Sequence, residues 1–412
     1  MKKISPLFFL CSIFFSHQIN TNFLQTAIQL SRQERYKEAL ECLKQCTQNE
    51  GALCNQGWIL RRMHRCHEAI DCYEQSLQLQ PNNPKALLGA ALSYLTIGNF
   101  QKGWPAYEYR WANPPEYNDH LKNYIEQYGN LGDKSVLLKC EFGLGDTMQF
   151  IRYAQLLKEL GAYVVVQAQK PLVKLLSLQP YIDEVIPAGS ATPTTDFTCQ
   201  LMSTPYILQS YEEAVLESVP YLHADKNLEQ KYKQFFEDRS SNKVLKIGLC
   251  WQAEPRKDSK DKIVKKDSAK KSIPLELLAQ LALLPNVQLF SLQKVDGLEQ
   301  MANLPENITL YAFKDFDEAS GPFMDTAALM KNLDLIITID TSVAHLAGGL
   351  GVAVWVLLPH SADWRWMLDR DDSPWYPTMK LFRQKKPGDW LSVVQEIKRE
   401  LKNYSPRCNA AA

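Results

Sequence analysis

The feature that most constrains the fold is the stretch from Asp334 to Leu358, in which two apolar runs flank a short segment rich in small residues. Leu335–Ile339 and Ala353–Leu358 are mostly β-branched or aliphatic, which is typical of parallel strands covered on both faces. The segment between them has room for one helix. The stretch therefore predicts a strand–helix–strand unit of a doubly wound α/β domain.

The helix predicted between these strands has two different faces. At about 100° per residue, Val343 and Leu346 fall on the apolar face, which should lie against the sheet. The other face carries His345 beside Gly348 and Gly349. The two glycines are small enough to let another group approach closely. We therefore expect His345 to point away from the apolar face and toward a ligand.

Polar residues stand where the first strand ends and the helix begins. The hydroxyls of Thr341 and Ser342, with the open N–H groups of the first helical turn, should face the crevice above the carboxyl ends of the strands. Those donors and the helix dipole favour an anion. Asp340 would lie within reach of a ribose or of His345. We therefore predict a phosphate site, the alternative being an ordinary turn in which Ser342 caps the helix and His345 is solvated.

Composition limits the classes of function. The 412 residues predict about two or three domains. The formal net charge is zero, so no nucleic-acid partner is expected. No apolar run has the length of a membrane span. We expect a cytoplasmic protein; the alternative is export or membrane tethering through residues 1–16, where two lysines precede an apolar stretch without a clear cleavage site.

Residues 20–111 read as repeated helical pairs, after a signal-like or disordered segment at 1–19. Ala39, Ala69 and Gly103 align with a period of 30 to 34 residues, which is typical of tetratricopeptide repeats. In the clearest repeat the signature positions hold Gly57, Ala69, Tyr73 and Pro81. Such an array offers a face for a protein or peptide partner, or it merely stiffens the domain that follows.

After a predicted linker at 112–134, the hydrophobic period changes. Residues 135–240 should form a first α/β domain, because a strand at Ser135–Cys140, a helix at Asp146–Leu160 and a strand at Val164–Ala168 make a βαβ unit. Further elements are expected at the positions Glu184–Ile186 for a strand and Tyr211–Glu217 and Asn227–Phe236 for helices.

The glycine turn of this unit does not predict a dehydrogenase. Gly143 and Gly145 begin a dinucleotide fingerprint, but Met148 replaces its third glycine and Gln167 follows where an acidic residue would be needed. The turn does supply a carboxylate, Asp146, at a helix N-terminus. Asp146 either caps that helix or serves as a general base if an acceptor hydroxyl reaches it.

Residues 243–402 should form a second α/β domain, which begins with the strand Val244–Trp251. The loop at 256–271 carries eight basic and three acidic side chains, so one or two cations could close over a diphosphate while the others stay solvated. Further elements are a helix at 274–283, a strand at 287–292, a helix at 325–331 and the C-terminal helix at 390–401. The ends of three strands should place a set of residues along one edge of this sheet. These residues are Trp251, Arg256, Gln293, Lys294, Asp340, Thr341 and Ser342.

A dense aromatic segment follows Leu358. Trp364, Trp366, Trp375 and Tyr376 either lock the C-terminal helix across both domains or form a stacking wall for a base or sugar ring. The aspartates of this segment lack a companion ligand, so we expect solvated surface or arginine pairing and no metal site. These residues are Asp369, Asp371 and Asp372.

Several motifs together resemble a known family. GLGDTMQFIRYA, GLCWQ, SLQK, DTAALMKNLDLIITIDTSVAHLAGGLG and DWRWMLDRDDSPWYP are similar to bacterial tetratricopeptide proteins that carry a glycosyltransferase family 9 domain, the heptosyltransferase-like family. The resemblance spans about residues 20 to 400. It implies the GT-B fold, two facing Rossmann-like domains, here preceded by an all-α repeat array. It also implies an inverting, metal-independent enzyme with no cofactor beyond a nucleotide-diphosphate sugar as co-substrate.

The resemblance also assigns roles to residues. Asp146 matches the family's proposed general base, with Gly145 beside it in the same turn. Residues that match contacts to the donor's diphosphate or nucleotide are Asp340, Thr341, His345, Lys294 and, before Ser-Ile-Pro-Leu, Lys271. The first domain would bind the acceptor, a protein or a glycan. The lysine-rich loop departs from the family pattern, so neither a heptose donor nor a lipopolysaccharide acceptor is assumed.

Overall fold

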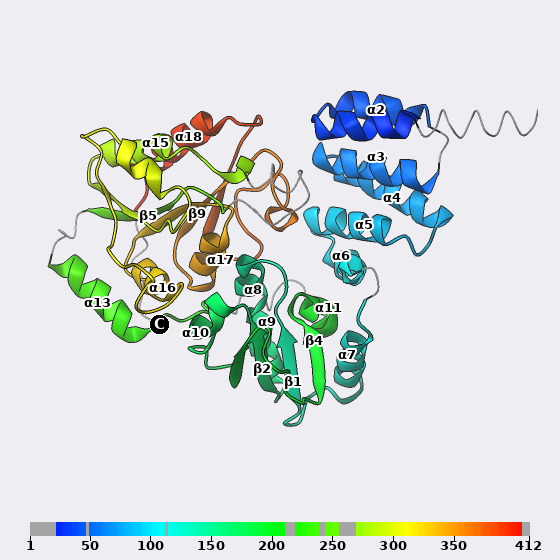
Figure 1. Ribbon diagram of the computed structural model, residues 1–412, viewed down its shortest axis with the longest axis horizontal. Helices are drawn as coiled ribbons and strands as arrows, with labels where there is room; N and C mark the ends of the chain where they lie inside the picture. Colours follow the sequence, from blue (N-terminus) through cyan, green and yellow to red (C-terminus); the bar gives the residue numbers. More distant parts are fainter. Residues whose placement is uncertain are drawn as a thin grey trace, which may run out of the picture. The chain divides into compact units, whose positions relative to one another are not determined.

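The computed structural model describes residues 22–46, 49–111, 114–210, 219–238, 244–254 and 269–405 (Figure 1). They fall into two compact units. The repeat unit holds Met1–Pro114 together with Asp363–Leu368, and the α/β unit holds Pro115–Ala362 and Asp369–Ala412. The segment at 1–19 and the helix expected at 211–217 lie outside the described residues.

The repeat unit is a stack of helices. After a helical stretch at 22–32, its helices are α2 (Tyr36–Lys44), α3 (Glu50–Arg62), α4 (Cys66–Leu79), α5 (Pro84–Thr96) and α6 (Phe100–Tyr107). The ring of Tyr73 lies between two glycines: a Cβ on Gly57 would come within 2.8 Å of it, and one on Gly89 would overlap it. Gly57, which was predicted, and Gly89, which was not, are therefore needed where α3, α4 and α5 touch.

Part of the aromatic segment belongs to the repeat unit. In the 3-10 helix η6 (Trp364–Trp366), the Trp364 ring lies 5.5 Å from that of Trp104 and 5.9 Å from that of Tyr107. Met367 meets Gly98 in the same unit. These side chains are packed, which was one of the two alternatives. Their partners belong to α5, the loop after it and α6, whereas the C-terminal helix had been expected.

The expected linker at 112–134 contains a helix, α7 (Glu116–Tyr128). It packs against strand β4 (Phe197–Gln200), which the sequence analysis did not predict. The buried Asn118 side chain donates to Ser203 Oγ at 2.9 Å and accepts from the Gln200 N–H at 3.2 Å. Helix α7 therefore belongs to the first α/β domain, and this part of the linker assignment is wrong.

The first α/β domain has a four-stranded parallel sheet of order β3-β2-β1-β4. Its other strands are β1 (Ser135–Lys139), β2 (Tyr163–Ala168) and β3 (Glu184–Pro187). The helix expected at 146–160 is two helices, α8 (Leu144–Phe150) and α9 (Arg152–Glu159). The further α-helices of this domain are α10 (Val173–Leu176) and α11 (Thr204–Leu208), whereas the next helix, α13 (Lys226–Glu237), packs against α16 (Met324–Met330) of the second domain. The order changes direction between β1 and β4, so the GLGD turn leaves β1 at this switch point.

The second domain has a six-stranded parallel sheet of order β10-β9-β8-β5-β6-β7. Its strands are β5 (Leu245–Cys250), β6 (Val287–Ser291), β7 (Leu310–Tyr311), β8 (Leu335–Ile339), β9 (Val354–Leu358) and β10 (Met379–Arg383). In chain order this is the doubly wound order 3-2-1-4-5-6, whose switch point lies between β5 and β8. Strands β7 and β10 were not predicted.

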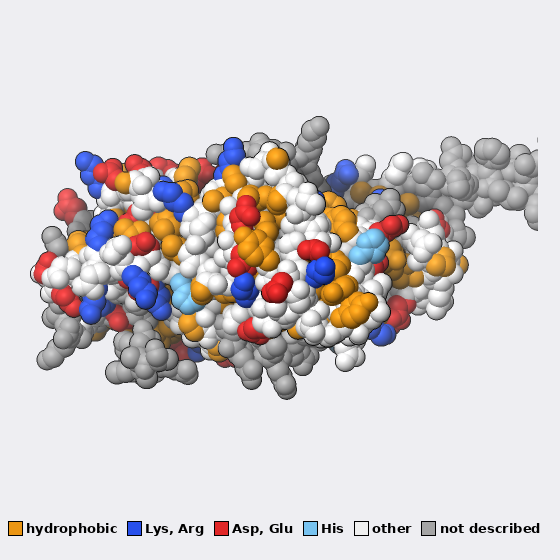
Figure 2. All heavy atoms as spheres, turned by 90° about the horizontal axis from the view of Figure 1, so that it is seen from below, with side chains coloured by type: hydrophobic (Ala, Val, Ile, Leu, Met, Phe, Trp, Pro, Cys, Tyr) orange, Lys and Arg blue, Asp and Glu red, His pale blue; other side chains and the backbone are white. Residues whose placement is uncertain are grey.

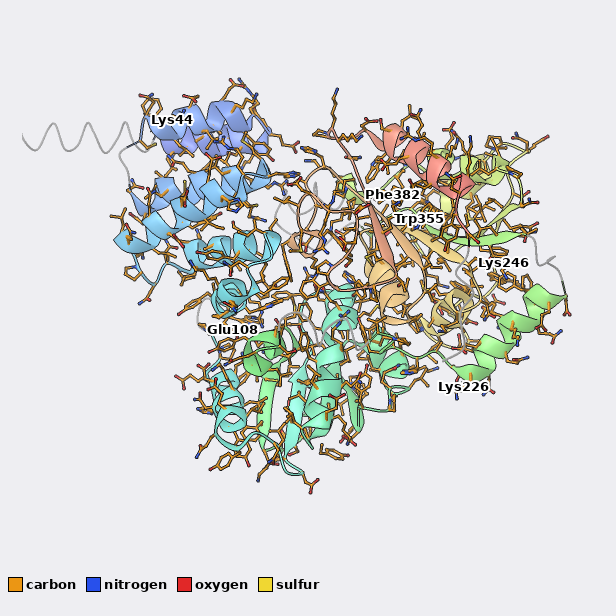
Figure 3. All side chains as sticks on the ribbon, turned by 180° about the vertical axis from the view of Figure 1, so that it is seen from behind. Lys44, Glu108, Lys226, Lys246, Trp355 and Phe382 are labelled. Atoms are coloured by element: carbon orange, nitrogen blue, oxygen red, sulfur yellow. The ribbon has the colours of Figure 1, made fainter. Side chains whose placement is uncertain are left out.

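Helices cover this sheet, and α15 and α18 enclose an apolar core with its strands. They are α15 (Leu275–Ala279), α16 (Met324–Met330), α17 (Ser342–Gly349) and α18 (Trp390–Lys402), with the 3-10 helices η4 (Gln280–Leu283) and η5 (Leu298–Asn303). Trp355 on β9 packs on Phe382 of the neighbouring β10, with ring centroids 5.0 Å apart (Figure 3). The two parallel sheets after a helical array confirm the predicted architecture of a repeat domain followed by two Rossmann-like domains.

On the face shown in Figure 2, acidic and basic side chains are interspersed, in keeping with the zero net charge. Within the described ranges, no helix combines the length and the apolar character needed to cross a bilayer.

Candidate functional site

The site is built around the N-terminus of α17, at the switch point of the second sheet. Thr341, not Ser342, is the N-cap residue, with φ −140° and ψ 177°. Its side chain makes no capping hydrogen bond, and its hydroxyl lies 3.5 Å from that of Thr338. The Ala344 N–H donates to the Thr341 carbonyl at 3.1 Å, but the Thr341 side chain leaves the N–H groups of Ser342 and Val343 to another acceptor, which is what an anion site requires.

Asp340 lies at the end of β8 and is buried, with 8% of its surface exposed. Its Oδ2 forms an ion pair with Lys271 Nζ at 2.6 Å. A cation from the segment before α15 is thereby held next to the start of α17. The predicted Lys271 and Asp340 come together, and a diphosphate here would meet that cation.

His345 is buried, with 5% of its surface exposed, and its Nδ1 lies 2.9 Å from the Tyr376 hydroxyl. The small residues around it accommodate protein side chains. A Cβ on Gly348 would overlap the Tyr376 ring, and one on Gly349 would come within 2.8 Å of Leu222. The solvated alternative for His345 is therefore wrong, and so is the expectation that these two glycines keep space for a ligand.

The GLGD turn meets the start of α17. Helices α8 and α17 pack against each other (Figure 1). A Cβ on Gly145 would lie 2.8 Å from His345 Cδ2 and 3.4 Å from Ser342 Cα. Asp146 follows Gly145 in the first turn of α8, and its Oδ2 accepts the Gly143 N–H at 2.8 Å. The first domain thus places Gly145, the residue before Asp146, against the start of α17.

Arg152 is a residue of this junction that the sequence analysis missed. Its fully buried guanidinium donates to the carbonyl oxygens of Gln149 and Trp375, both at 2.9 Å, and to the Tyr221 hydroxyl at 3.1 Å. It also lies over the Tyr376 ring at 4.9 Å. Burial opposes its charge, but the tyrosine hydroxyls raise its pKa overall, so the cation persists. The sequence does contain a signal for Arg152, because this arginine lies on a helix face whose other residues are buried.

Gln293 and Trp251 were predicted to contact the nucleotide sugar, but their side chains bond to other parts of the protein instead. Gln293 is buried, and its Oε1 accepts the N–H groups of Trp251 and Gln252, each at 3.0 Å. Its Nε2 donates to the carbonyl oxygens of Gln252 and Asp296. The Trp251 side chain lies fully inside the core and donates to the Gly297 carbonyl at 3.2 Å. Neither side chain is directed to a ligand, so both shape the loop after β5.

The remaining predicted residues are Lys294 and Arg256. Lys294 is exposed and pairs with Glu318 at 3.3 Å, and its ammonium also donates to the Phe316 carbonyl. Arg256 lies outside the described residues. Asp372 is paired with Arg370 through two hydrogen bonds of 2.7 Å, as expected for that segment.

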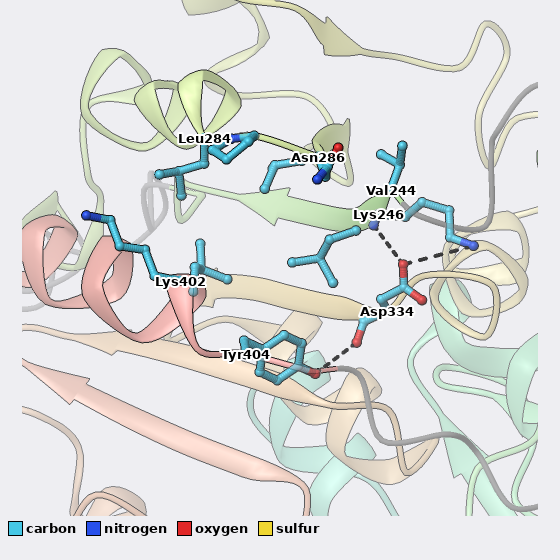
Figure 4. Close-up of a pocket in the computed structure, with 11 residues that line it drawn as sticks. Val244, Lys246, Leu284, Asn286, Asp334, Lys402 and Tyr404 are labelled. Carbon is cyan, nitrogen blue, oxygen red and sulfur yellow. Dashed lines mark hydrogen bonds and ion pairs between the residues drawn. The ribbon is translucent and has the colours of Figure 1, made fainter.

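A cavity of about 660 Å³ lies at the opposite edge of the second sheet (Figure 4). It is lined by residues at the starts of β5, β6 and β8, and by the end of α18. There the Tyr404 hydroxyl donates to the Asp334 carbonyl at 3.1 Å. The polar groups of the α8–α17 junction are at the carboxyl ends of the strands, so this cavity is not the candidate site.

Comparison with known proteins identifies the repeats. Residues 50–83 match the tetratricopeptide repeat family. These residues are a tetratricopeptide repeat. Over 363 residues the chain is 22% identical to Protein FlbA of Caulobacter vibrioides, which covers 81% of this chain and 58% of that protein. The chain thus spans little more than half the length of this curated relative.

Two solved structures are similar to the α/β part. A glycosyl transferase family 9 structure from Veillonella parvula is 14% identical, covers 68% of this chain and 93% of that chain, and gives a TM-score of 0.43. The ADP-heptose lps heptosyltransferase II of E. coli is 15% identical, covers 65% of this chain and 98% of that chain, and gives a TM-score of 0.45.

Proposed function

We propose that the α/β unit is a glycosyltransferase that moves a sugar from a nucleotide-diphosphate sugar to an acceptor hydroxyl, with inversion and without a metal. The observation that carries the proposal is the contact between the GLGD turn and the start of α17. It brings Gly145, the neighbour of the carboxylate Asp146, against a helix N-terminus whose cap residue makes no side-chain capping hydrogen bond. A base and an anion site side by side are the two groups that glycosyl transfer needs.

The switch points of both sheets support this assignment. In open parallel sheets ligands bind beyond the carboxyl ends of the strands at the switch point. The first sheet places the GLGD turn there, and the second places Thr341 and Ser342 there. The diphosphate would bind at Ser342, with Lys271 and His345 as further partners, while the acceptor would approach from Asp146.

The proposed reaction is a single displacement. Asp146 takes the proton of the acceptor hydroxyl while the acceptor oxygen bonds to the anomeric carbon. The bond from that carbon to the phosphate oxygen breaks, and its electron pair stays on the departing nucleoside diphosphate. Negative charge grows on that group, so stabilisation by the α17 N–H groups, Lys271 and His345 lowers the barrier.

A second candidate is a non-catalytic interaction protein in which the repeats bind a protein or peptide. The tetratricopeptide repeat at 50–83 favours this reading. The two candidates differ in one measurable respect, since only the enzyme releases a nucleoside diphosphate from a nucleotide sugar. A panel of ADP-, GDP-, UDP-, CDP- and dTDP-sugars, incubated with the full chain and assayed for released diphosphate, separates them.

The Asp146→Asn variant tests the base. Asparagine keeps an oxygen that can accept the Gly143 N–H, so α8 should retain its cap while the base is lost. We expect turnover to fall by about 100-fold or more with unchanged nucleoside diphosphate affinity in calorimetric titration. Unchanged turnover would remove the assignment.

Asp225→Asn is the matched control. Asp225 caps α13 by accepting the N–H groups of Asn227 and Leu228 at 2.9 and 3.0 Å, so its change alters a cap without touching the site. An equal loss of turnover in this variant would mean that the effect of Asp146→Asn comes from capping and not from proton transfer.

A further inference from the structure

The contact between His345 and Tyr376 bears on which nitrogen of the imidazole carries the proton. Nδ1 lies 2.9 Å from the Tyr376 hydroxyl, so one of the two groups donates to the other. The opposite edge of the ring, with Cδ2 and Nε2, faces Gly145, because a Cβ there would lie 2.8 Å from Cδ2 and 3.6 Å from Nε2. The edge that faces the GLGD turn therefore contains Nε2.

A neutral imidazole has one donor and one acceptor nitrogen. If the Tyr376 hydroxyl donates to Nδ1, the proton must be on Nε2, which then donates toward the junction. If Nδ1 carries the proton, Nε2 can only accept there and would repel an anion. The identity of the donor in this one hydrogen bond therefore decides whether His345 can stabilise a phosphate.

The surroundings of Tyr376 favour its hydroxyl as the donor. The Arg152 guanidinium lies 4.9 Å from its ring centroid and donates to the carbonyl of the preceding residue, Trp375, at 2.9 Å. A fixed positive charge withdraws electron density from the phenol, which makes its O–H a better donor and its oxygen a poorer acceptor. Gly348 leaves the room in which this ring lies against α17.

We propose that Tyr376 is a positioning residue that holds His345 in the Nε2-protonated tautomer, and that Arg152 fixes Tyr376 for this purpose. The inference rests on the proposed function, since it specifies how His345 would donate to the diphosphate. Arg152 comes from α9 of the first domain, whereas Tyr376 and His345 belong to the second. The proton position at the site therefore depends on a residue of the other domain.

The tautomer can be measured directly. In the full chain labelled with ¹⁵N-histidine, the nitrogen shifts distinguish Nδ1 from Nε2 protonation, and the His345→Gln variant identifies its signals among the seven histidines. We expect Nε2–H in the unmodified chain and a mixture of tautomers, or Nδ1–H, in Tyr376→Phe. Nδ1–H in the unmodified chain, or a tautomer unaffected by Tyr376→Phe, would overturn the proposal.

Nucleotide titration supplies the second readout. We expect Tyr376→Phe to weaken binding of the nucleoside diphosphate by about tenfold, the ratio expected for one lost hydrogen bond. Arg152→Met should give a similar loss, and Arg152→Lys should recover part of it because the charge is kept. Equal affinity of Tyr376→Phe and the unmodified chain would refute the positioning role.

Tyr404→Phe is the matched control, because its hydroxyl also makes one hydrogen bond, to the Asp334 carbonyl, at the opposite edge of the sheet. It should change neither the tautomer nor the affinity. Failure of the unmodified chain to bind ADP, GDP, UDP, CDP or dTDP would overturn the proposed function, and the tautomer measurement would then decide on the role of Tyr376 by itself.

Discussion

Single residues decide how closely the helices of the repeat unit approach. The Tyr73 ring occupies the space that side chains at Gly57 and Gly89 would need, whereas Gly51, near the start of α3, meets only Asn49 Oδ1 at 3.5 Å from a Cβ. Gly89→Ala should therefore destabilise the unit by about 1–3 kcal/mol through overpacking. Gly51→Ala should be neutral or stabilising by about 0.5–1 kcal/mol. Hydrogen exchange of α4 and α5 in both variants checks this, and equal protection would contradict it.

The position of a residue was predictable where secondary structure determines it. Its burial and its partners were less predictable where they depend on tertiary contacts. Strand and helix periodicity placed Asp340, Thr341 and Ser342 at the carboxyl end of β8. The burial of His345 was missed because it depends on Tyr376, which is distant in sequence. Arg152 was missed because its partners are scattered over three separate segments.

At the scale of elements, one amide side chain organises the loop after β5. Gln293→Met keeps the volume of Gln293 but removes two acceptor and two donor contacts to backbone groups. Each buried group left unsatisfied should cost about 1–3 kcal/mol. We expect a lower urea midpoint for the α/β unit. Gln234→Met, which changes an exposed side chain bonded only to Asp238 among the contacts described, should leave the midpoint unchanged.

Asp325 of α16 connects several elements and makes stability depend on pH. It accepts hydrogen bonds from Tyr232 of α13, at 2.8 Å, and from Ser320. Burial alone would raise its pKa, but these bonds and Lys231 lower it overall. Because the folded pKa is below the unfolded value, the stabilisation is complete above about pH 4 and is lost as the pH falls through the folded pKa.

The Asp325→Asn variant should therefore show a flatter dependence of the urea midpoint on pH between 6 and 3 than the unmodified chain, as judged by fluorescence-monitored unfolding. A variant with an equally steep acid dependence would show that other carboxylates account for it.

The elements that sequence analysis found are those with long apolar runs, and the missed ones are short or amphipathic. Strand β8 is fully buried and was predicted to the residue, whereas β4 is a half-buried strand of four residues. Helix α7 follows two prolines and presents mostly polar residues, and only Asn118 and Leu121 are buried within it. Its covering of β4 could not be predicted without that strand.

At the scale of the whole molecule, the repeat unit requires residues from two distant parts of the chain. Trp364→Ala should destabilise the repeat unit by about 3–5 kcal/mol, because it removes a large buried ring that packs on Trp104 and Tyr107. Faster hydrogen exchange in α5 and α6 is the expected result. Leu391→Ala, which shortens a side chain that is 52% exposed, is the comparison and should leave these helices unaffected.

Because Asp363–Leu368 belongs to the repeat unit, it also determines which fragments of the chain can be expressed separately. A fragment that stops at Pro114 exposes the surface of Trp104 that Trp364 covers, and a fragment that starts at Pro115 carries Trp364 without Trp104 and Tyr107. Either product should be prone to aggregation during expression. Joining the residues from Asp363 to Leu368 behind Pro114 through a glycine–serine linker should restore a well-behaved isolated repeat fragment.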